Sequence, residues 1–328
     1  MLNRTSRYIA IACSLMLVFE GCKEDDYALP TPKDALQNDV IKRSMGPNIV
    51  GTNIEFTYAM ALPAAKGKLS SAQVEATIPG AAATYLEYRS FYTNGSGVDV
   101  GVPVGNPSVN TGSVTKVDFT KDTSASTLRY FYTVPEDARG KPVSFTFSAL
   151  SSDGSKVTYK MGPYNVSKMD MKLDLVVTDA NRCFISIADM AVYTAAEAGP
   201  KATNIDLVYI YRVLTNATYN HSLVAPVTEA QYLQGAVIPA GITNNSKLVK
   251  AWNLRDFQLS RAAYNVYVDD VDFQKKDFKD APNFAINMKA EAGLWVETAD
   301  GKYRAYIYIN KVDNAAKSAT ISIKRYAM

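Results

Sequence analysis

Short alternating segments separated by turn signals are the feature that most constrains the fold of this chain. Residues 54–60 alternate apolar and polar side chains, and residues 73–78 do the same. A period of two residues is typical of a strand that buries one of its faces. Turn signals punctuate these segments at Asn94-Gly95, Asn106-Pro107 and Asp153-Gly154. The pattern predicts antiparallel β-structure.

Three further strands continue the pattern of the first domain. Residues 128–134 and 143–149 are rich in aromatic and β-branched side chains, and the segment 135–141 joins them. Residues 157–159 can pair back across the turn at Asp153-Gly154. About seven short strands in ~120 residues are typical of an immunoglobulin-like β-sandwich, here without its cysteine pair. We therefore predict such a sandwich for residues 46–166.

Residues 167–328 predict a second β-rich domain, either a β-sandwich or an α+β fold, with short helices. The expected strands are residues 174–177, 184–187, 205–211, 294–298, 303–309 and 320–324. Asp300-Gly301 provides a hairpin turn between two of them. The expected helices are residues 228–233, a stretch within 254–264, and 272–279. Thr228 and Gln231 stand at the spacing of a capping box.

The first 26 residues resemble a bacterial lipoprotein signal. Arg4 and Arg7 precede an apolar run at residues 8–19, which is shorter than the ~20 residues of a membrane-spanning helix. Gly21-Cys22 follows, and the charged run 23–26 comes next. The sequence predicts a signal peptide at residues 1–21 and lipidation of Cys22. An ordinary secretory signal with an incidental Cys22 is the alternative, because Phe19 and Glu20 depart from the usual lipobox.

A tether is expected to follow the lipidated cysteine. Residues 22–45 are dominated by charged residues, asparagine and proline, with Pro30 and Pro32 close together. Such a composition predicts an extended linker that lifts the first domain away from the membrane.

Charge and cysteine content argue against nucleic-acid binding and against an intramolecular disulfide. The net charge of +3 falls to +2 without Arg4, Arg7 and Glu20, so no nucleic-acid footprint is indicated. Loss of Cys13 with the signal and lipidation of Cys22 leave Cys183 alone, so no intramolecular disulfide is expected. Cys183 lies among apolar residues and is predicted to be a buried small hydrophobe.

No catalytic signature is recognisable, and neither a cofactor nor a metal site is predicted. The single histidine, His221, is expected on a surface loop or at a cap, without a nucleophile or an orienting carboxylate. Asp269, Asp270 and Asp272 are expected in a solvated loop or at a helix N-terminus. A calcium site and a catalytic carboxylate pair are the alternatives for this cluster.

The two tryptophans are the candidate ligand contacts. Trp252 has the polar neighbours Lys250, Asn253 and Arg255, which suit a sugar ring stacked on the indole. We take Trp252 as the candidate ligand-binding residue, with core or groove packing as its alternative. Trp295 lies on an alternating strand and is expected to face the core.

Two segments resemble surface lipoproteins of the Bacteroidetes. Residues 132–140, 144–149 and 153–154 are similar to the end of the immunoglobulin-like domains of such proteins. Residues 184–194 and 204–209 resemble a pattern in uncharacterised lipoproteins of the same phylum. The charged run 23–26 after Cys22 is similar to the signal that sends these lipoproteins to the outer face. The resemblance implies lineage and location, and it implies no activity and no site residues.

The sequence thus predicts a non-enzymatic lipoprotein anchored in the outer membrane and exposed at the cell surface. It is expected to bind a glycan or a partner protein, with an accessory role in nutrient uptake as one extension. The alternative is a structural or adhesion component that pairs through exposed sheet edges. A hydrolase with a dispersed carboxylate site is the third hypothesis.

Overall fold

The computed structural model describes residues 33–262 and 265–328. The predicted signal peptide, Cys22 and residues 22–32 of the tether lie outside the described residues. The described chain is mainly β, with several antiparallel sheets and a few short helices, and this confirms the predicted fold class. Within the described ranges, no helix is long and apolar enough to cross a membrane.

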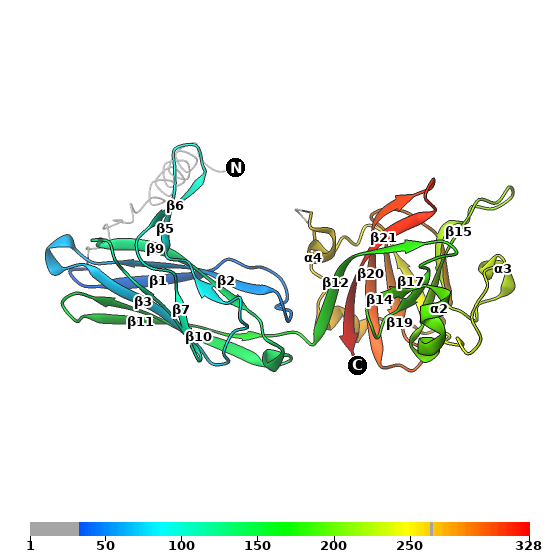
Figure 1. Cartoon of the computed structure of the whole chain (residues 1–328), viewed down its shortest axis with the longest axis horizontal. Helices are drawn as coiled ribbons and strands as arrows, with labels where there is room; N and C mark the ends of the chain where they lie inside the picture. The colour runs from blue at the N-terminus through cyan, green and yellow to red at the C-terminus, as the bar shows by residue number, and fades with distance from the viewer. Residues whose placement is uncertain (1–32, 263–264) are drawn as a thin grey trace, which may run out of the picture. The chain divides into compact units, whose positions relative to one another are not determined.

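Two antiparallel sheets form the first sandwich (Figure 1). The first sheet has the order β1 (Gln37–Lys42), β2 (Asn53–Ala61), β9 (Ala125–Thr133), β4 (Tyr85–Leu86). The second has the order β11 (Lys156–Asn165), β10 (Pro142–Ser151), β3 (Leu69–Ala76), β8 (Val114–Asp118), β7 (Val109–Thr111). A separate hairpin, β5 (Arg89–Thr93) with β6 (Asp99–Pro103), stands out from these sheets (Figure 1). Short 3-10 turns lie at Ala64–Lys66 and Glu136–Ala138.

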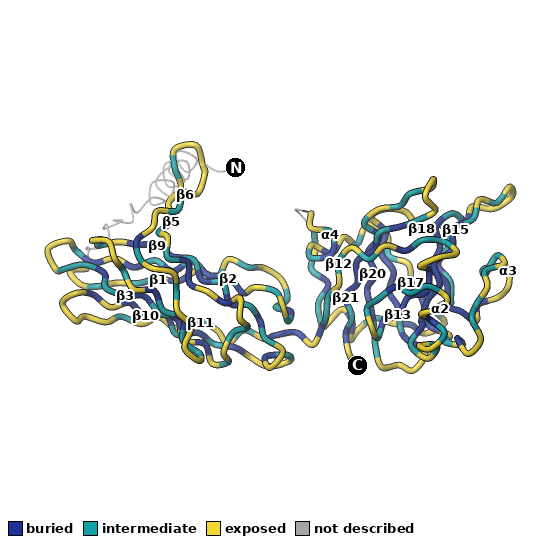
Figure 2. The backbone as a smooth tube through the Cα atoms, in the orientation of Figure 1, coloured by how far each residue is buried: buried dark blue, intermediate teal, exposed yellow. Residues whose placement is uncertain are grey.

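Aromatic side chains from the two facing sheets fill the core of this sandwich. Phe56 on β2 meets Phe145 and Phe147 on β10 edge to face, with ring centroids 4.9 and 5.2 Å apart. Tyr130 on β9 meets Phe147 in the same way at 5.9 Å. These rings stand at the buried, alternating positions of their strands, and offset or edge-to-face contact is the favoured geometry for them. Figure 2 shows the burial along the strands and the exposure of the connecting loops.

Two details of the first domain differ from the prediction. Strand β1 lies inside the range 22–45 that was predicted to be an extended tether, so the tether is wrong for these residues. Only Val40 is buried in β1, because an edge strand needs little apolar surface, and this explains why its composition looks like that of a linker. The region from β1 to β11 also has eleven strands where about seven were expected. The additional strands include short, exposed ones such as β7.

Two five-stranded antiparallel sheets form the second sandwich. The first has the order β12 (Met169–Thr178), β21 (Ser318–Ala327), β20 (Tyr303–Asp313), β19 (Gly293–Glu297), β17 (Lys247–Ala251). The second has the order β14 (Ala191–Tyr193), β13 (Phe184–Ser186), β15 (Leu207–Arg212), β16 (Asn220–Val224), β18 (Phe284–Met288). Ile307 on β20 and Val208 on β15 belong to one buried apolar cluster. This β-sandwich is one of the two folds that the sequence left open.

Strand β20 is buried on both of its faces. Ile307 and Ile309 point into the cluster shared with the second sheet, whereas Tyr306 and Tyr308 belong to a separate cluster that includes Phe273. Phe273 is the buried residue of helix α5 (Asp270–Lys275). The first sheet is therefore covered by the second sheet on one side and by short helices on the other.

The short helices depend on local capping. Helix α5 begins with a complete capping box between Asp269 and Asp272. Helix α4 (Phe257–Ser260) is capped by Asp256, which accepts a hydrogen bond from the Leu259 N–H. Helix α3 (Ala230–Leu233) lies within the predicted range, but the predicted capping box is wrong because Thr228 donates its hydroxyl to Asn283 instead. Helix α2 (Ala195–Ala198) runs into a 3-10 segment at Gly199–Asn204.

Candidate functional site

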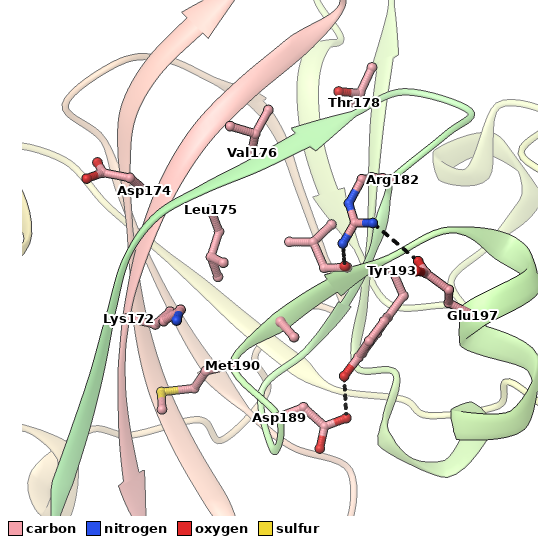
Figure 3. A pocket seen from close by; sticks show the side chains of 12 residues that line it. Lys172, Asp174, Leu175, Val176, Thr178, Arg182, Asp189, Met190, Tyr193 and Glu197 are labelled. Carbon is pink, nitrogen blue, oxygen red and sulfur yellow. Dashed lines mark hydrogen bonds and ion pairs between the residues drawn. The ribbon is translucent and has the colours of Figure 1, made fainter.

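An open groove lies between the edge strands of the second sandwich. Strand β12 is the outer strand of one sheet and β14 is the outer strand of the other. Side chains from both strands line a hollow of about 570 Å³, together with residues of the β13–β14 turn and of α2 (Figure 3). We call this hollow the edge groove. Its volume lies within the ~300–1,000 Å³ range of ligand pockets.

A β-bulge shapes the β12 side of the edge groove. The register of β12 against β21 shifts between Lys172 and Leu175, and Asp174 takes a positive φ of 59° inside this interval. The Ser322 hydroxyl accepts a hydrogen bond from the Asp174 N–H at 3.2 Å. The Asp174 carboxylate accepts two hydrogen bonds from the Arg261 guanidinium at 2.8 and 2.9 Å. Such a bulge re-aims neighbouring side chains, and here Lys172 and Leu175 both line the groove.

A carboxylate in the β13–β14 turn faces the same groove. Asp189 accepts a hydrogen bond from the Tyr193 hydroxyl at 2.9 Å (Figure 3). It also accepts one from the Lys201 ammonium at 3.4 Å. Partial burial acts to raise the pKa of Asp189, but the Tyr193 hydrogen bond and the Lys201 charge outweigh it and hold that pKa below its usual value. Asp189 is therefore an ionised acceptor at neutral pH.

An arginine connects the β14 strand to helix α2. The Arg182 guanidinium donates to the Val192 carbonyl oxygen and lies 3.4 Å from the Glu197 carboxylate (Figure 3). Glu197 also closes the capping box of α2 by accepting from the Thr194 N–H at 2.8 Å. The hydrogen bonds from Thr194 lower the pKa of Glu197. These contacts hold the Arg182 guanidinium, a donor, and the Glu197 carboxylate, an acceptor, in fixed positions at the end of the groove.

The edge groove is suited to binding a polar ligand. Its ionic groups carry both signs, with Lys172 and Arg182 against Asp174, Asp189 and Glu197. Charged donors and acceptors make the stronger class of hydrogen bonds to ligand hydroxyl groups. Leu175 and Met190 add apolar surface to the lining (Figure 3). In the described part of the chain, no three His, Cys, Asp or Glu side chains are placed to hold a metal ion.

The predicted ligand residue Trp252 lies away from this groove. It follows β17, which is at the opposite edge of the sheet from β12. Trp252 is 53% exposed, and the Lys250 ammonium lies 5.5 Å from its ring centroid. Asn253 and Arg255 line a smaller hollow of about 310 Å³ next to it in the chain. Trp252 is thus an accessible aromatic surface, separate from the edge groove.

Trp295 and Cys183 occupy the environments that the sequence predicts. Trp295 is buried on β19 and packs against Tyr306, with ring centroids 4.7 Å apart. Cys183 is 6% exposed, and burial raises the pKa of its thiol to about 11. A thiol with that pKa stays protonated at neutral pH and is a poor nucleophile.

The prediction for His221 is wrong. It is a buried residue of strand β16, and not a surface loop residue. Its Nδ1 is 2.5 Å from the Tyr209 hydroxyl, and its Nε2 is 2.7 Å from the Asn314 side-chain oxygen. Both ring nitrogens are therefore engaged in holding β16 to neighbouring segments. The adjacent Asn220 and Ser222 made the segment look like a loop, although Ser222 is itself buried and donates to the Tyr219 carbonyl oxygen.

The aspartate cluster has a structural role at the start of α5. Asp269 accepts from the N–H groups of Val271 and Asp272 at 2.9 and 3.2 Å, and Asp272 accepts from the Asp269 N–H. Asp270 accepts from the Ser167 hydroxyl. The three side chains are thus placed at a helix N-terminus, which was the expected position.

Both halves of the chain match families without an assigned activity. Residues 33–166 match the model described as domain of unknown function DUF4466, and residues 167–328 match the model described as domain of unknown function DUF8576. Among solved structures, the chain is similar to a DUF4466 family protein from Parabacteroides merdae. The two are 46% identical with a TM-score of 0.85, covering 90% of this chain and 100% of that one.

A second structural similarity is too weak to carry an argument. The major pilin subunit of Bacillus cereus is 11% identical with a TM-score of 0.28, over 60% of this chain and 62% of that one. The comparison with curated proteins finds no match.

Proposed function

The chain belongs to the DUF4466 family, and we propose that it is a non-catalytic glycan-binding protein whose edge groove holds the ligand. The observation that carries the proposal is the lining of the groove. Charged donors and acceptors of both signs line it together with Leu175 and Met190. A sugar presents hydroxyl groups that both donate and accept, and apolar C–H faces between them. An uncharged sugar can therefore hydrogen-bond to the charged groups of the groove and pack its C–H faces against the apolar ones.

The proposed location is the outer face of the outer membrane, with Cys22 as the lipid anchor. The sequence pattern of the first 26 residues supports this proposal, as does similarity to a protein from a Bacteroidetes species. We further propose that the first sandwich is immunoglobulin-like and acts as a spacer for the second. Its two packed antiparallel sheets support that assignment. A surface-anchored glycan binder fits an accessory role in nutrient uptake.

Calorimetric titration of purified protein against a glycan panel tests the binding proposal. Asp189→Asn keeps an acceptor for the Tyr193 hydroxyl but removes the charge, and it is expected to weaken binding roughly tenfold. Trp252→Ala is the matched control, because Trp252 is at the other edge of the sheet. A flat response across the panel would refute the glycan proposal. Loss of binding in Trp252→Ala alone would move the site to that tryptophan.

Protease treatment of intact cells tests the proposed location. The wild-type protein is expected to be degraded on intact cells, and Cys22→Ala is expected to leave the cell envelope fraction. Protection of the wild-type protein would place it on the periplasmic side and direct the search toward envelope partners.

An adhesion component that pairs through sheet edges is the second candidate function. Strand β11 supports it, because among the described strands this ten-residue strand is hydrogen-bonded only to β10. A long edge strand presents unpaired main-chain groups that another chain can pair with. A pull-down from outer-membrane extract that yields no stoichiometric partner would count against this candidate.

A further inference from the structure

A second hollow lies in the same sandwich and has a different chemistry. Its volume is about 520 Å³, and its lining includes the first turn of α2, strand β15 and the loop 235–239. The edge groove is lined by Tyr193 and Glu197, whereas this hollow is lined by the intervening Thr194, Ala195 and Ala196. We call it the α2 pocket.

The floor of the α2 pocket is apolar and buried. Cys183, Phe184, Val208 and Tyr209 form it, and each is less than 10% exposed. The Tyr209 hydroxyl is engaged with His221 at 2.5 Å, so the ring rather than the hydroxyl is what a ligand meets. Small side chains at the walls leave the space open, since the lining includes Ala180, Ala195, Ala196, Gly235 and Ala236.

The polar wall of the pocket carries no net charge. Asp179 and Arg212 form an ion pair of 2.6 Å in which the aspartate side chain is only 10% exposed. Arg212 also donates to the carbonyl oxygens of Gln234 at 3.2 Å and Tyr211 at 2.7 Å. Burial raises the pKa of Cys183 to about 11, so its thiol is uncharged as well. A charged ligand would have to compete with this pair, whereas a neutral hydroxyl group can both accept from the guanidinium and donate to the carboxylate.

We propose that the α2 pocket is a second binding site, for a small neutral molecule with an aromatic or alicyclic body and one hydroxyl group. The body rests on Phe184 and the Tyr209 ring, and the hydroxyl group faces the Asp179–Arg212 pair. A pocket with an apolar lining and a few convergent polar groups is the usual form of a small-molecule site. The site is independent of glycan binding at the edge groove.

Titration with p-cresol, a neutral probe of this class, tests the proposal on the purified chain. Binding is expected, and Ala236→Phe is expected to weaken it at least roughly tenfold because the new ring fills the pocket. Val213→Phe is the matched control, since Val213 is 75% exposed and does not line the pocket. Ala195→Leu serves as a second filling variant if Ala236→Phe does not fold.

The outcomes separate this site from the edge groove. Asp189→Asn is expected to leave p-cresol binding unchanged, because Asp189 lines only the groove. p-Toluate, which carries a carboxylate in place of the hydroxyl group, is expected to bind at least roughly tenfold more weakly. The proposal is overturned if p-cresol does not bind at up to about 10 mM. It is also overturned if neither filling variant weakens binding, or if p-toluate binds as tightly.

Discussion

Removal of the buried Lys324 ammonium is expected to destabilise the second sandwich strongly. Lys324 on β21 donates to the Asp256 carboxylate at 2.6 Å, and both side chains are 0% exposed. Asp256 also accepts from the N–H groups of Leu259 at 2.9 Å and Val268 at 2.7 Å. The carboxylate thus links a sheet strand to α4 and to the segment that follows it. Lys324→Met leaves that carboxylate buried without its cation.

The size of the effect follows from the cost of a buried unpaired charge. Breaking a buried ion pair by removing one partner costs about 3–5 kcal/mol. Burial lowers the pKa of Lys324, and Asp256 opposes this shift without cancelling it. The charged form of Lys324 is therefore less favoured in the folded protein than in water, even beside Asp256. Neutralising both residues in Asp256→Asn/Lys324→Met should restore part of the loss.

Tryptophan fluorescence provides a selective assay for these variants. The chain has two tryptophans, Trp252 and Trp295, and both belong to the second sandwich. Trp295 packs edge to face against Phe273 at 5.3 Å, so its emission should change when this region unfolds. Urea titrations of the wild type, both single variants and the double variant form a double-mutant cycle. Additive effects of the two single variants, or a loss below about 1 kcal/mol for Lys324→Met, would refute the reasoning.

Three further changes have expected outcomes. The pKa of Asp206 is raised to about 7, mainly by burial. The contribution of this shift to the free energy of unfolding is therefore fully present below the unfolded-state pKa of ~4, and it is lost as the pH rises through about 7. Asp206→Asn should flatten that decline, which is worth about 4 kcal/mol at most, in urea titrations from pH 4 to 8. Gly293→Ala would place its Cβ against the Tyr306 hydroxyl and should cost about 1–3 kcal/mol by the same fluorescence assay. Phe145→Ala empties the centre of the first sandwich, where Phe145 is 1% exposed, and should cost about 3–5 kcal/mol in thermal unfolding followed by near-ultraviolet circular dichroism. An unchanged transition for either of these last two variants would contradict the packing described.

The regular strands were predictable because their burial alternates with the sequence. Residues 54–60 and 143–149 fall inside β2 and β10, and the hairpin around Asp300-Gly301 joins β19 to β20. Strands β16 and β18 were not predicted. In β16, His221 and Ser222 are polar but buried, because their hydrogen bonds to Asn314 and Tyr219 replace those to water. A periodicity argument treats such residues as exposed and therefore misses the strand.

The edge groove could not be predicted, because its residues look like ordinary surface charges. Lys172, Asp174 and Arg182 stand in or beside predicted strands, and Asp189 belongs to the stretch that the lipoprotein resemblance covers. Their proximity depends on β12 and β14 being the outer strands of their sheets. Strand order is a long-range property, so no local pattern reports it. Trp252, by contrast, was predicted as a ligand contact from the chemistry of its own side chain. The structure leaves it exposed, but it follows β17, at the opposite edge of the sheet from β12.

Both proposed sites include residues of helix α2, whose start is marked in the sequence by a capping box. Thr194 caps the helix and Glu197 completes the capping box, and together they fix four residues that would otherwise be too few for a stable helix. Glu197 faces the edge groove, while Ala195 and Ala196 line the α2 pocket. Both hollows therefore share this short capped helix as part of their lining. Both proposed sites include a helix held by capping contacts, and such contacts leave no trace in the alternation of the strands, which is why the alternating strands alone do not reveal them.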